Sequence, residues 1–140
     1  MKVLLDTNIV LDLLLEREPF SADAKTIFTL IETKKIDGVL CATTITTLYY
    51  LISKQMNKIK TNKIIESLLS IFSVASVDKT VLLDSLKNSG TDFEDSVIYT
   101  SSKFSNVDII LTRDAKGFKK STVSVMQTKE FLASYSNLDL

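Results

Sequence analysis

Val3-Leu4-Leu5-Asp6 is a short apolar run that ends on a carboxylate. Apolar runs without polar alternation are typical of strands that are buried on both faces, as in a parallel sheet. Asp6 then lies at the end of a buried strand, where its charge costs free energy unless a partner compensates it. These residues therefore predict a parallel sheet with a functional carboxylate at its edge.

The rest of the chain alternates strand patterns with amphipathic helix patterns. Because parallel strands need crossover helices, this alternation predicts an α/β fold: a three-layer α/β/α sandwich with a central, mainly parallel five-stranded sheet. No repeat, low-complexity stretch or long linker divides the 140 residues, so a single domain over 1–140 is expected. The expected strands are 3–5, 39–42, 71–77, 108–112 and 123–126, and the expected helices are 9–15, 22–34 with Ser21 as its cap, 43–56, 62–70, 79–87, 91–104 and 128–134.

Small polar residues and glycines mark where helices and turns are expected to begin or end. The residues expected in these places are Ser21, Thr61 and Asp78 as helix N-caps, Asp37-Gly38 as a turn, and Gly90 as a helix end.

Composition excludes several kinds of chemistry. The chain has no histidine, which removes Ser-His-Asp and Cys-His mechanisms and histidine-ligated zinc. Cys41 is the single cysteine, so no internal disulfide forms, and a buried thiol in a reducing compartment is expected. Basic and acidic residues number 17 each, so net charge neither supports nor excludes a nucleic-acid partner. No signal peptide is recognisable and no run reaches the roughly 18 apolar residues of a membrane span, so a cytoplasmic protein without a membrane partner is expected.

Two further acidic groups resemble Asp6 in their placement. Residues 92–95 (Asp-Phe-Glu-Asp) open an expected helix, and Asp114 follows the expected strand 108–112. In a parallel sheet, the carboxyl ends of the strands and the N-termini of the crossover helices lie at one edge, so these segments are expected to meet. Clustered carboxylates repel one another, and a site that tolerates them usually holds a hard cation such as Mg²⁺. The pattern predicts a metal-dependent enzyme that acts on phosphates.

The acidic residues also have structural interpretations, of which the one for Asp6, at the end of a buried strand, is the weakest. Asp114 can be an N-cap after its strand, although a site role is favoured. Thr91 and Glu94 fit a capping box, and Asp92 can itself be an N-cap. Asp95 lies in a first helical turn, where an anion favours the helix dipole. A site role is nevertheless favoured for Asp95, because Phe93 and Val97 are expected to face the core.

Neighbouring polar side chains are expected to support the cluster. Thr7, Asn8, Asp92 and Thr112 are placed to hydrogen-bond a carboxylate or a metal-bound water. For Asp12, a solvated or supporting position is favoured over direct metal binding.

With these residues identified, the chain resembles the PIN-domain family of VapC-type toxin ribonucleases over essentially its whole length. Each motif alone is weakly specific, but their order and spacing together are strong. The matching stretches are Leu4-Leu5-Asp6-Thr7-Asn8-Ile9, then Asp92-Phe93-Glu94-Asp95-Ser96 with Asp95 as the family's acid, and Ile109-Ile110-Leu111-Thr112-Arg113-Asp114 with Phe118 at the usual aromatic position.

One motif departs from the family. A glutamate is common in the helix after the second strand, whereas this chain is rich in threonine there, with Thr47 or a neighbour in its place and no acid between Asp37 and Glu66. In this respect it is similar to a threonine-rich subgroup of PIN-like proteins. Either Glu94, Asp92 or a hydroxyl with a water replaces the missing carboxylate, or metal affinity and activity are weak or lost.

The resemblance implies hydrolysis of RNA phosphodiester bonds. It implies one or two Mg²⁺ or Mn²⁺ ions held by Asp6, Asp95 and Asp114, with Glu94 as a further catalytic carboxylate. It also implies a small antitoxin that covers the acidic pocket, and a homodimer.

Basic and aromatic side chains supply candidates for RNA binding. Any single lysine is equally well explained as part of a solvated rim, and two of the three tyrosines are expected to pack in the core. The candidates are Arg113, Lys116, Lys58 and Lys60, with Lys54, Lys63, Lys119 and Lys120 nearby and Tyr49, Tyr50 and Tyr99 as possible stacking residues.

Three alternatives compete with the nuclease hypothesis. The first keeps the fold without the chemistry, as a nucleic-acid-binding or partner-binding module, and the missing glutamate favours it. A receiver domain needs an aspartate acceptor after its third strand and a lysine after its fifth, which this chain does not place well. A haloacid-dehalogenase-type phosphatase needs Asp-x-Asp, whereas residues 6–8 read Asp-Thr-Asn.

Overall fold

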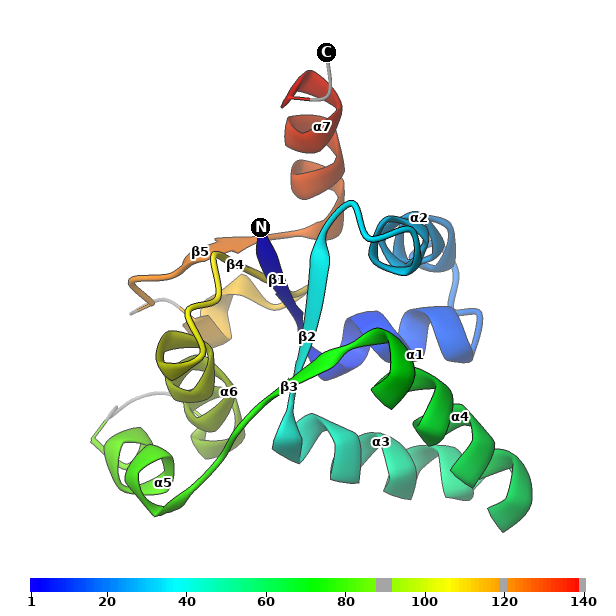
Figure 1. Ribbon diagram of the computed structural model, residues 1–140, viewed down its shortest axis with the longest axis horizontal. Coiled ribbons are helices and arrows are strands. Elements are labelled where there is room, and N and C mark those ends of the chain that lie inside the picture. The colour runs from blue at the N-terminus through cyan, green and yellow to red at the C-terminus, as the bar shows by residue number, and fades with distance from the viewer. Residues whose placement is uncertain (88–91, 119–120, 139–140) are drawn as a thin grey trace.

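The computed structural model describes residues 1–87, 92–118 and 121–138. Five strands form one parallel sheet in the order β3-β2-β1-β4-β5, with helices on both faces, which confirms the predicted α/β fold (Figure 1). The elements are β1 (Lys2–Leu5), α1 (Thr7–Leu14), α2 (Ser21–Glu32), β2 (Asp37–Cys41), α3 (Ala42–Ser53), α4 (Lys58–Ile71), β3 (Ser73–Ala75), α5 (Lys79–Ser85), α6 (Phe93–Phe104), β4 (Ile109–Leu111), the 3₁₀ helix η1 (Ala115–Phe118), β5 (Ser124–Met126) and α7 (Thr128–Leu138).

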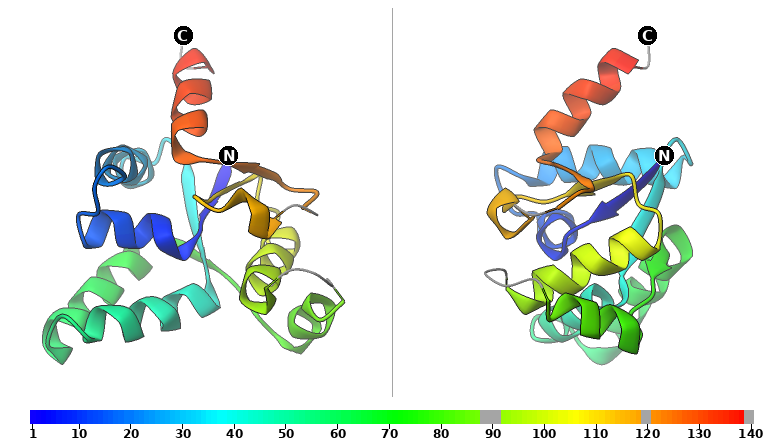
Figure 2. Two further views of the ribbon diagram at one scale, coloured as in Figure 1. Left: turned by 180° about the vertical axis from the view of Figure 1, so that it is seen from behind. Right: turned by 90° about the vertical axis from the view of Figure 1, so that its left-hand side faces the viewer.

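The side chains of β1 enter two different cores, because successive residues of a strand point to opposite faces of the sheet. Val3 and Leu5 pack in a core that also contains residues of α1, α2, α3, α4 and α7. Leu4 packs on the other face, with residues of α5, α6 and η1. Figure 2 shows these two helical layers from behind and from the side. Burial on both faces explains why the run carries no polar residue before Asp6.

β1 occupies the centre of the sheet. It pairs with β2 on one side, with Leu4 opposite Val39, and with β4 on the other, with Leu5 opposite Leu111. From β1 the chain adds β2 and β3 on one side of the sheet and then β4 and β5 on the other. Open parallel sheets bind ligands beyond the carboxyl ends of the strands at the place where the direction changes in this way. The fold therefore directs attention to the residues that follow β1 and β4.

The predicted turn at Asp37-Gly38 is wrong, because these residues begin β2. The Asp37 amide donates to the Met1 carbonyl at 2.9 Å, which extends the pairing with β1. Gly38 is needed because a Cβ there would lie 2.7 Å from both Ile31 Cγ2 and Phe72 Cδ1. The glycine thus permits close packing of a strand, not a change of chain direction.

Two predicted N-caps are also wrong. Ser21 is the first residue of α2, and its hydroxyl donates to Glu18 Oε1 at 2.7 Å. In α4 the cap is Asn57, whose Oδ1 accepts from the Lys60 amide at 2.8 Å, while the Thr61 hydroxyl donates to the Asn57 carbonyl. Each helix begins before the position expected for it, so both helices contain the residue expected to precede them.

Other boundaries agree more closely with the predictions. α5 begins as expected, because Asp78 Oδ1 accepts from the Val81 amide at 3.0 Å. α7 continues past its expected end to Leu138. Gly90 and Thr91, expected at a helix end and in a capping box, lie outside the described residues. Within the part of the chain that the structure describes, no helix has the length and hydropathy to cross a membrane.

Candidate active site

Asp6 joins β1 to α1 at the carboxyl edge of the sheet. Its amide donates to the Leu111 carbonyl at 2.9 Å, and its Oδ1 accepts from the Thr7 amide at 2.8 Å. This cap starts α1 at Thr7, earlier than the expected start at Ile9, so Thr7 and Asn8 lie in the first helical turn. The side chain of Asp6 is thereby held at the N-terminus of a helix, with the residue only 7% exposed.

Thr112 connects Asp6 to the loop that carries Asp114. Its hydroxyl donates to Asp6 Oδ2 at 2.8 Å and accepts from the Asp114 amide at 3.0 Å. A hydroxyl suits this place because it has one proton to donate and two lone pairs to accept with. Thr112 is fully buried and lies where the sequence predicts a supporting residue.

Asp95 lies in the first turn of α6, at the same edge. Asp92 caps this helix through Oδ1, which accepts from the amides of Glu94 and Asp95 at 2.9 and 3.3 Å, so its structural interpretation is confirmed. Val97 faces the core as expected, but Phe93 does not, because it is 48% exposed. The orientation of α6 therefore depends on Val97 and the residues that follow it.

The charges of all three acidic segments act on Asp95. Burial is the main cause that raises this pKa to about 6, and four other carboxylates contribute to the increase, in the order Asp6, Asp92, Asp114 and Glu94. Like charges act in this way only when they are close. We call these five residues the acidic cluster.

Asp6 also has a pKa above its ordinary value. Burial is the main cause, and the charge of Asp114 adds to it. The hydrogen bonds from Thr112 and Thr7 oppose the increase, because they stabilise the ionised carboxylate. Raised pKa values are expected of clustered carboxylates that no cation neutralises.

Gly117 lies against the Asp95 side chain and was not expected from the sequence to take part. A Cβ at Gly117 would overlap Asp95 Oδ2. The Gly117 amide also donates to the Asp114 carbonyl at 3.3 Å, which closes the turn after Asp114. The carboxylate of Asp95 thus fills the space that any other side chain would need. The only sequence feature that singled out position 117 was the rarity of glycine, with three in the chain.

Threonines of α3 line the cluster where the resemblance leads one to expect a glutamate. The Thr7 hydroxyl donates to that of the buried Thr44 at 3.3 Å. The Thr47 hydroxyl donates to Glu94 Oε1 over 3.5 Å, which is a long and weak hydrogen bond. α3 therefore contributes hydroxyl groups to the site, and Glu94 of α6 is the acidic side chain that contacts Thr47.

The buried Asp12 and the partly exposed Arg113 form a charge pair. Arg113 Nε lies 3.0 Å from Asp12 Oδ2, but its N–H is not aligned for a hydrogen bond, so the contact is electrostatic. The guanidinium carbon lies 4.1 Å from the centre of the Phe20 ring. Asp12 is 1% exposed, which excludes the solvated alternative, and burial raises its pKa although Arg113 and Arg17 oppose this. The pair ties α1 to the residue that precedes Asp114.

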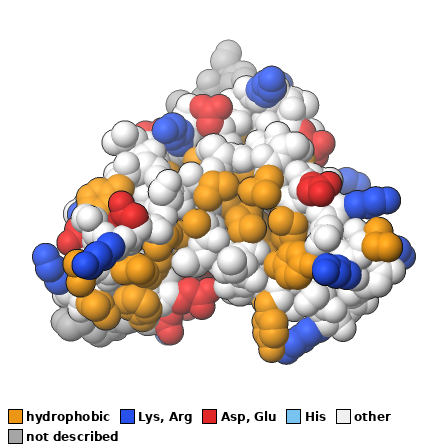
Figure 3. All heavy atoms as spheres, turned by 60° about the horizontal axis from the view of Figure 1, so that its bottom comes forward, with side chains coloured by type: hydrophobic (Ala, Val, Ile, Leu, Met, Phe, Trp, Pro, Cys, Tyr) orange, Lys and Arg blue, Asp and Glu red, His pale blue; other side chains and the backbone are white. Residues whose placement is uncertain are grey.

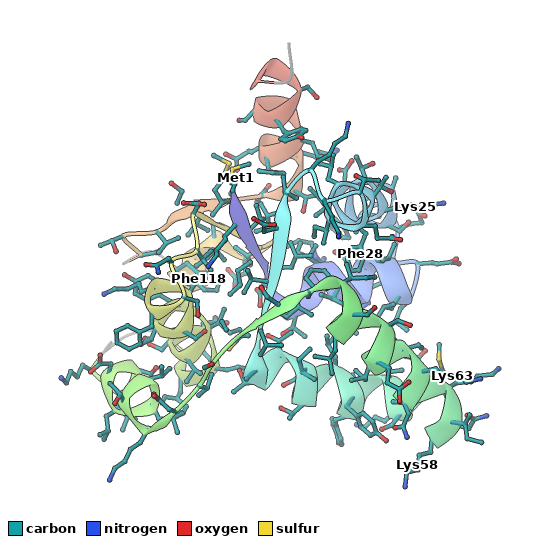
Figure 4. The ribbon with its side chains drawn as sticks, viewed as in Figure 1. Met1, Lys25, Phe28, Lys58, Lys63 and Phe118 are labelled. Carbon is teal, nitrogen blue, oxygen red and sulfur yellow. The ribbon has the colours of Figure 1, made fainter. Side chains whose placement is uncertain are left out.

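The predicted RNA-binding residues fall in two places. Arg113 and the exposed Lys116 flank Asp114 beside the cluster. Lys58 and Lys60 lie in the first turn of α4, at the tip of the α3–α4 hairpin, and Figure 4 shows Lys58 pointing away from the body of the molecule. Lys119 and Lys120 lie outside the described residues.

The surface is hollowed between the lobe of α5 and α6 and the lobe of α3 and α4. Figure 3 shows this notch, with acidic side chains on one rim and hydrophobic and basic side chains on the other. The hydrogen bond from Thr47 of α3 to Glu94 of α6 crosses between the two lobes.

The donor chemistry of the cluster fits a hard divalent cation. Its groups are carboxylate oxygens supported by hydroxyls, which Mg²⁺ and Mn²⁺ prefer over nitrogen or sulfur. Among the residues that the structure describes, no three acidic side chains lie close enough to enclose an ion.

Comparison with known proteins adds a family and a fold. A family model described as "PIN domain" matches residues 2–116. Ribonuclease VapC1 of Aquifex aeolicus (strain VF5) is 28% identical over 142 aligned residues, covering 98% of this chain and 97% of that protein. The structure of VapBC-1 from nontypeable Haemophilus influenzae matches with a TM-score of 0.69 at 21% identity, over 92% of this chain and 99% of that one. A toxin–antitoxin complex from Klebsiella pneumoniae also matches with a TM-score of 0.69, at 19% identity, over 90% and 97%. At these identities the two structural matches concern the fold alone.

Proposed function

This chain belongs to the PIN-domain family, and on that premise we propose that it is an Mg²⁺- or Mn²⁺-dependent endoribonuclease, the toxin of a toxin–antitoxin pair. The observation that carries the proposal is the meeting of three acidic segments: the Thr112 hydroxyl joins Asp6 to the Asp114 amide, and the Asp95 carboxylate lies against Gly117. Burial and four neighbouring carboxylates raise the pKa of Asp95 to about 6, as such a cluster requires. The similarity to a ribonuclease supports RNA as the substrate. We also propose that residues 1–140 form one domain and that the protein is cytoplasmic, where RNA is available as a substrate.

Asp6, Asp95 and Asp114 are the residues proposed to hold the cation, since they come from three elements at one sheet edge. A bound divalent ion would polarise the phosphate and lower the pKa of an attacking water. One buried hydroxyl, that of Thr112, positions the Asp6 carboxylate and the backbone of Asp114.

Glu94 is proposed to take the place of the missing glutamate of α3. Its side chain is exposed, it faces Thr47, and its charge contributes to the raised pKa of Asp95. A carboxylate in this position can orient the attacking water and accept its proton. Asp92 is less suited, because its Oδ1 already accepts two helix amides.

Lys116 is proposed to bind the RNA backbone next to the reacting phosphate. It is exposed, and it follows Asp114 by two residues. Arg113 adds positive potential at the same place, although its Nε faces Asp12. Lys58 and Lys60 are proposed to contact the RNA backbone farther from the reacting phosphate.

The function is tested by incubating the protein with single-stranded RNA, with EDTA or with Mn²⁺. We expect cleavage with Mn²⁺ and none with EDTA, and calorimetry should detect Mn²⁺ binding without RNA. A chain that binds RNA but neither binds Mn²⁺ nor cleaves would instead be the binding module considered above. A crystal soaked in Mn²⁺ should show anomalous signal between Asp6, Asp95 and Asp114.

A small antitoxin and a homodimer are proposed as protein partners. The matches to VapBC and toxin–antitoxin complexes support the antitoxin, which we expect to bind over the acidic cluster and inhibit cleavage when added to the purified protein. The homodimer is supported by α5, which packs against α6, and by its C-cap, because Leu82, Leu83 and Leu86 are exposed there. Exposed apolar patches of this kind commonly mark protein interfaces.

Leu83→Asp is expected to shift the protein from dimer to monomer in sedimentation velocity, because a charge would be buried without a partner. Leu69→Asp is the matched control, since Leu69 is an equally apolar, exposed residue on α4. A wild-type chain that sediments as a monomer at all concentrations would contradict the homodimer and leave the nuclease proposal intact.

A further inference from the structure

We propose that one face of α3 and its C-cap, which we call the α3 strip (Thr47, Tyr50 and the C-cap Lys54), binds a segment of single-stranded RNA next to the acidic cluster. Tyr50 stacks on a base and Lys54 contacts a phosphate. This inference rests on the proposed ribonuclease function and adds to it a surface that holds the substrate on one side of the cleaved bond.

The strip starts at the acidic cluster and leads away from it. Its residues are spaced i, i+3 and i+7, so they lie on one face of the helix. Thr47 contacts Glu94 of the cluster. Tyr50 follows one helical turn later, about 4.5 Å along the axis. A base held by Tyr50 would therefore belong to a nucleotide close to the reacting phosphate.

Tyr50 is exposed, whereas the two other tyrosines considered for stacking are held by contacts within the protein. The Tyr49 hydroxyl donates to Asn62 Oδ1 at 2.7 Å, and its ring packs against the core. The Tyr99 hydroxyl is hydrogen-bonded to Thr122 and its ring packs on the opposite core. Tyr50 is 60% exposed, and the Lys54 ammonium lies 4.3 Å from its ring centre. An exposed ring beside a cation is the combination that binds stacked bases of a single strand.

The charge of the hairpin favours a polyanion over a second protein surface. Residues 38–65 contain Lys54, Lys58, Lys60 and Lys63 and no acidic residue, whereas the rest of this neutral chain has an excess of acids. Figure 4 shows Lys58 and Lys63 on α4 at the outer part of the hairpin, pointing outward. An RNA segment that leaves the acidic cluster along α3 therefore meets charged side chains of residues 38–65 that are all positive. Stacking is tolerant of sequence, so the strip adds affinity for single strands without reading a particular base.

The absence of tryptophan from the chain allows a direct test. Tyr50→Trp places a single fluorescent indole in the strip, which we call the strip reporter. Phe104→Trp places one at the exposed C-terminal end of α6, as a matched control reporter. Each variant is titrated in EDTA with a single-stranded RNA 12-mer and with a polyphosphate that lacks bases.

We expect RNA to quench the strip reporter with a saturating curve that weakens steeply between about 50 and 200 mM salt, because phosphate contacts release counterions. The control reporter should be unaffected by RNA. The polyphosphate should not quench the strip reporter, since it has no base to stack on the ring.

The same site is tested without a reporter by two substitutions. Tyr50→Ala should weaken RNA binding about tenfold and Tyr50→Phe should leave it unchanged, because the ring and not the hydroxyl binds the base. Equal affinity of wild type and Tyr50→Ala for RNA would contradict the stacking role.

Three outcomes separate the strip from the function on which it rests. Wild-type protein that binds and cleaves RNA while the strip reporter is not quenched overturns the α3 strip and leaves the ribonuclease proposal standing. Strip-reporter fluorescence that changes with protein concentration and not with RNA would identify a protein interface and likewise overturn the strip. Wild-type protein that neither binds nor cleaves RNA overturns both proposals.

Discussion

Asp6→Asn is expected to lower Mn²⁺-dependent RNA cleavage by about 100-fold or more. Asp6 directly follows the central strand and is one of the proposed metal ligands. A ligand that supports a metal-polarised phosphate contributes several kcal/mol to transition-state stabilisation, and each 1.4 kcal/mol corresponds to about tenfold in rate. The loss is measured as the initial rate of cleavage of a labelled single-stranded RNA at saturating Mn²⁺.

The same substitution should change the metal-free thermal midpoint little. The amide oxygen can still accept from the Thr7 amide, and an amide is less costly to bury than the carboxylate whose pKa burial raises. Asp37→Asn is the matched control, because Asp37 is an exposed aspartate at the opposite end of the neighbouring strand. Equal cleavage rates for wild type and Asp6→Asn would remove Asp6 from the mechanism.

Asp95→Asn is expected to abolish cleavage and to raise the metal-free thermal midpoint at pH 7.5. The folded-state pKa of Asp95, about 6, is above its ordinary value of 3.8, so the folded protein binds this proton more readily than the unfolded chain. The ionised group therefore destabilises the fold above pH 6, and this cost disappears below the unfolded pKa. Because the group is partly exposed, we expect a gain on the order of 1 kcal/mol, or a few degrees.

Two controls separate this effect from a general change in stability. The difference in midpoint between wild type and Asp95→Asn should be largest above pH 7 and vanish below about pH 4, following the two pKa values. Added Mn²⁺ should raise the midpoint of wild type, because it binds only the folded state, and should not raise that of the variant. A variant that is less stable than wild type at pH 7.5 without metal would show that Asp95 stabilises the fold, for example as part of the α6 cap.

The strands and the acidic edge were predictable because they depend on local pattern and on topology. β1 and β4 are apolar runs buried on both faces, and parallel strands bring their carboxyl ends to one edge. Helix starts were less predictable, since neighbouring residues compete for the same amides. Asn57 and Thr61 both suit an N-cap, and only the folded chain shows that Asn57 caps α4.

Individual side-chain contacts between segments distant in the sequence were not predictable, although the meeting of the acidic segments at one edge was. Nothing near Asp12 in the chain indicates that Arg113 lies beside it, and nothing near Gly117 indicates that Asp95 fills the space beside its Cα. The exposure of Tyr50 and the core packing of Tyr49 differ although the two residues are adjacent, because the path of α4 decides which side of α3 is covered.

The amino-acid sequence by itself determined a parallel α/β sheet with carboxylates gathered at one edge, because strand burial and crossover topology follow from periodicity along the chain. Only the tertiary structure decided how strongly those carboxylates interact and which side chains hold them. Burial and through-space charge set the pKa of Asp95, and both depend on distances between residues that are far apart along the chain.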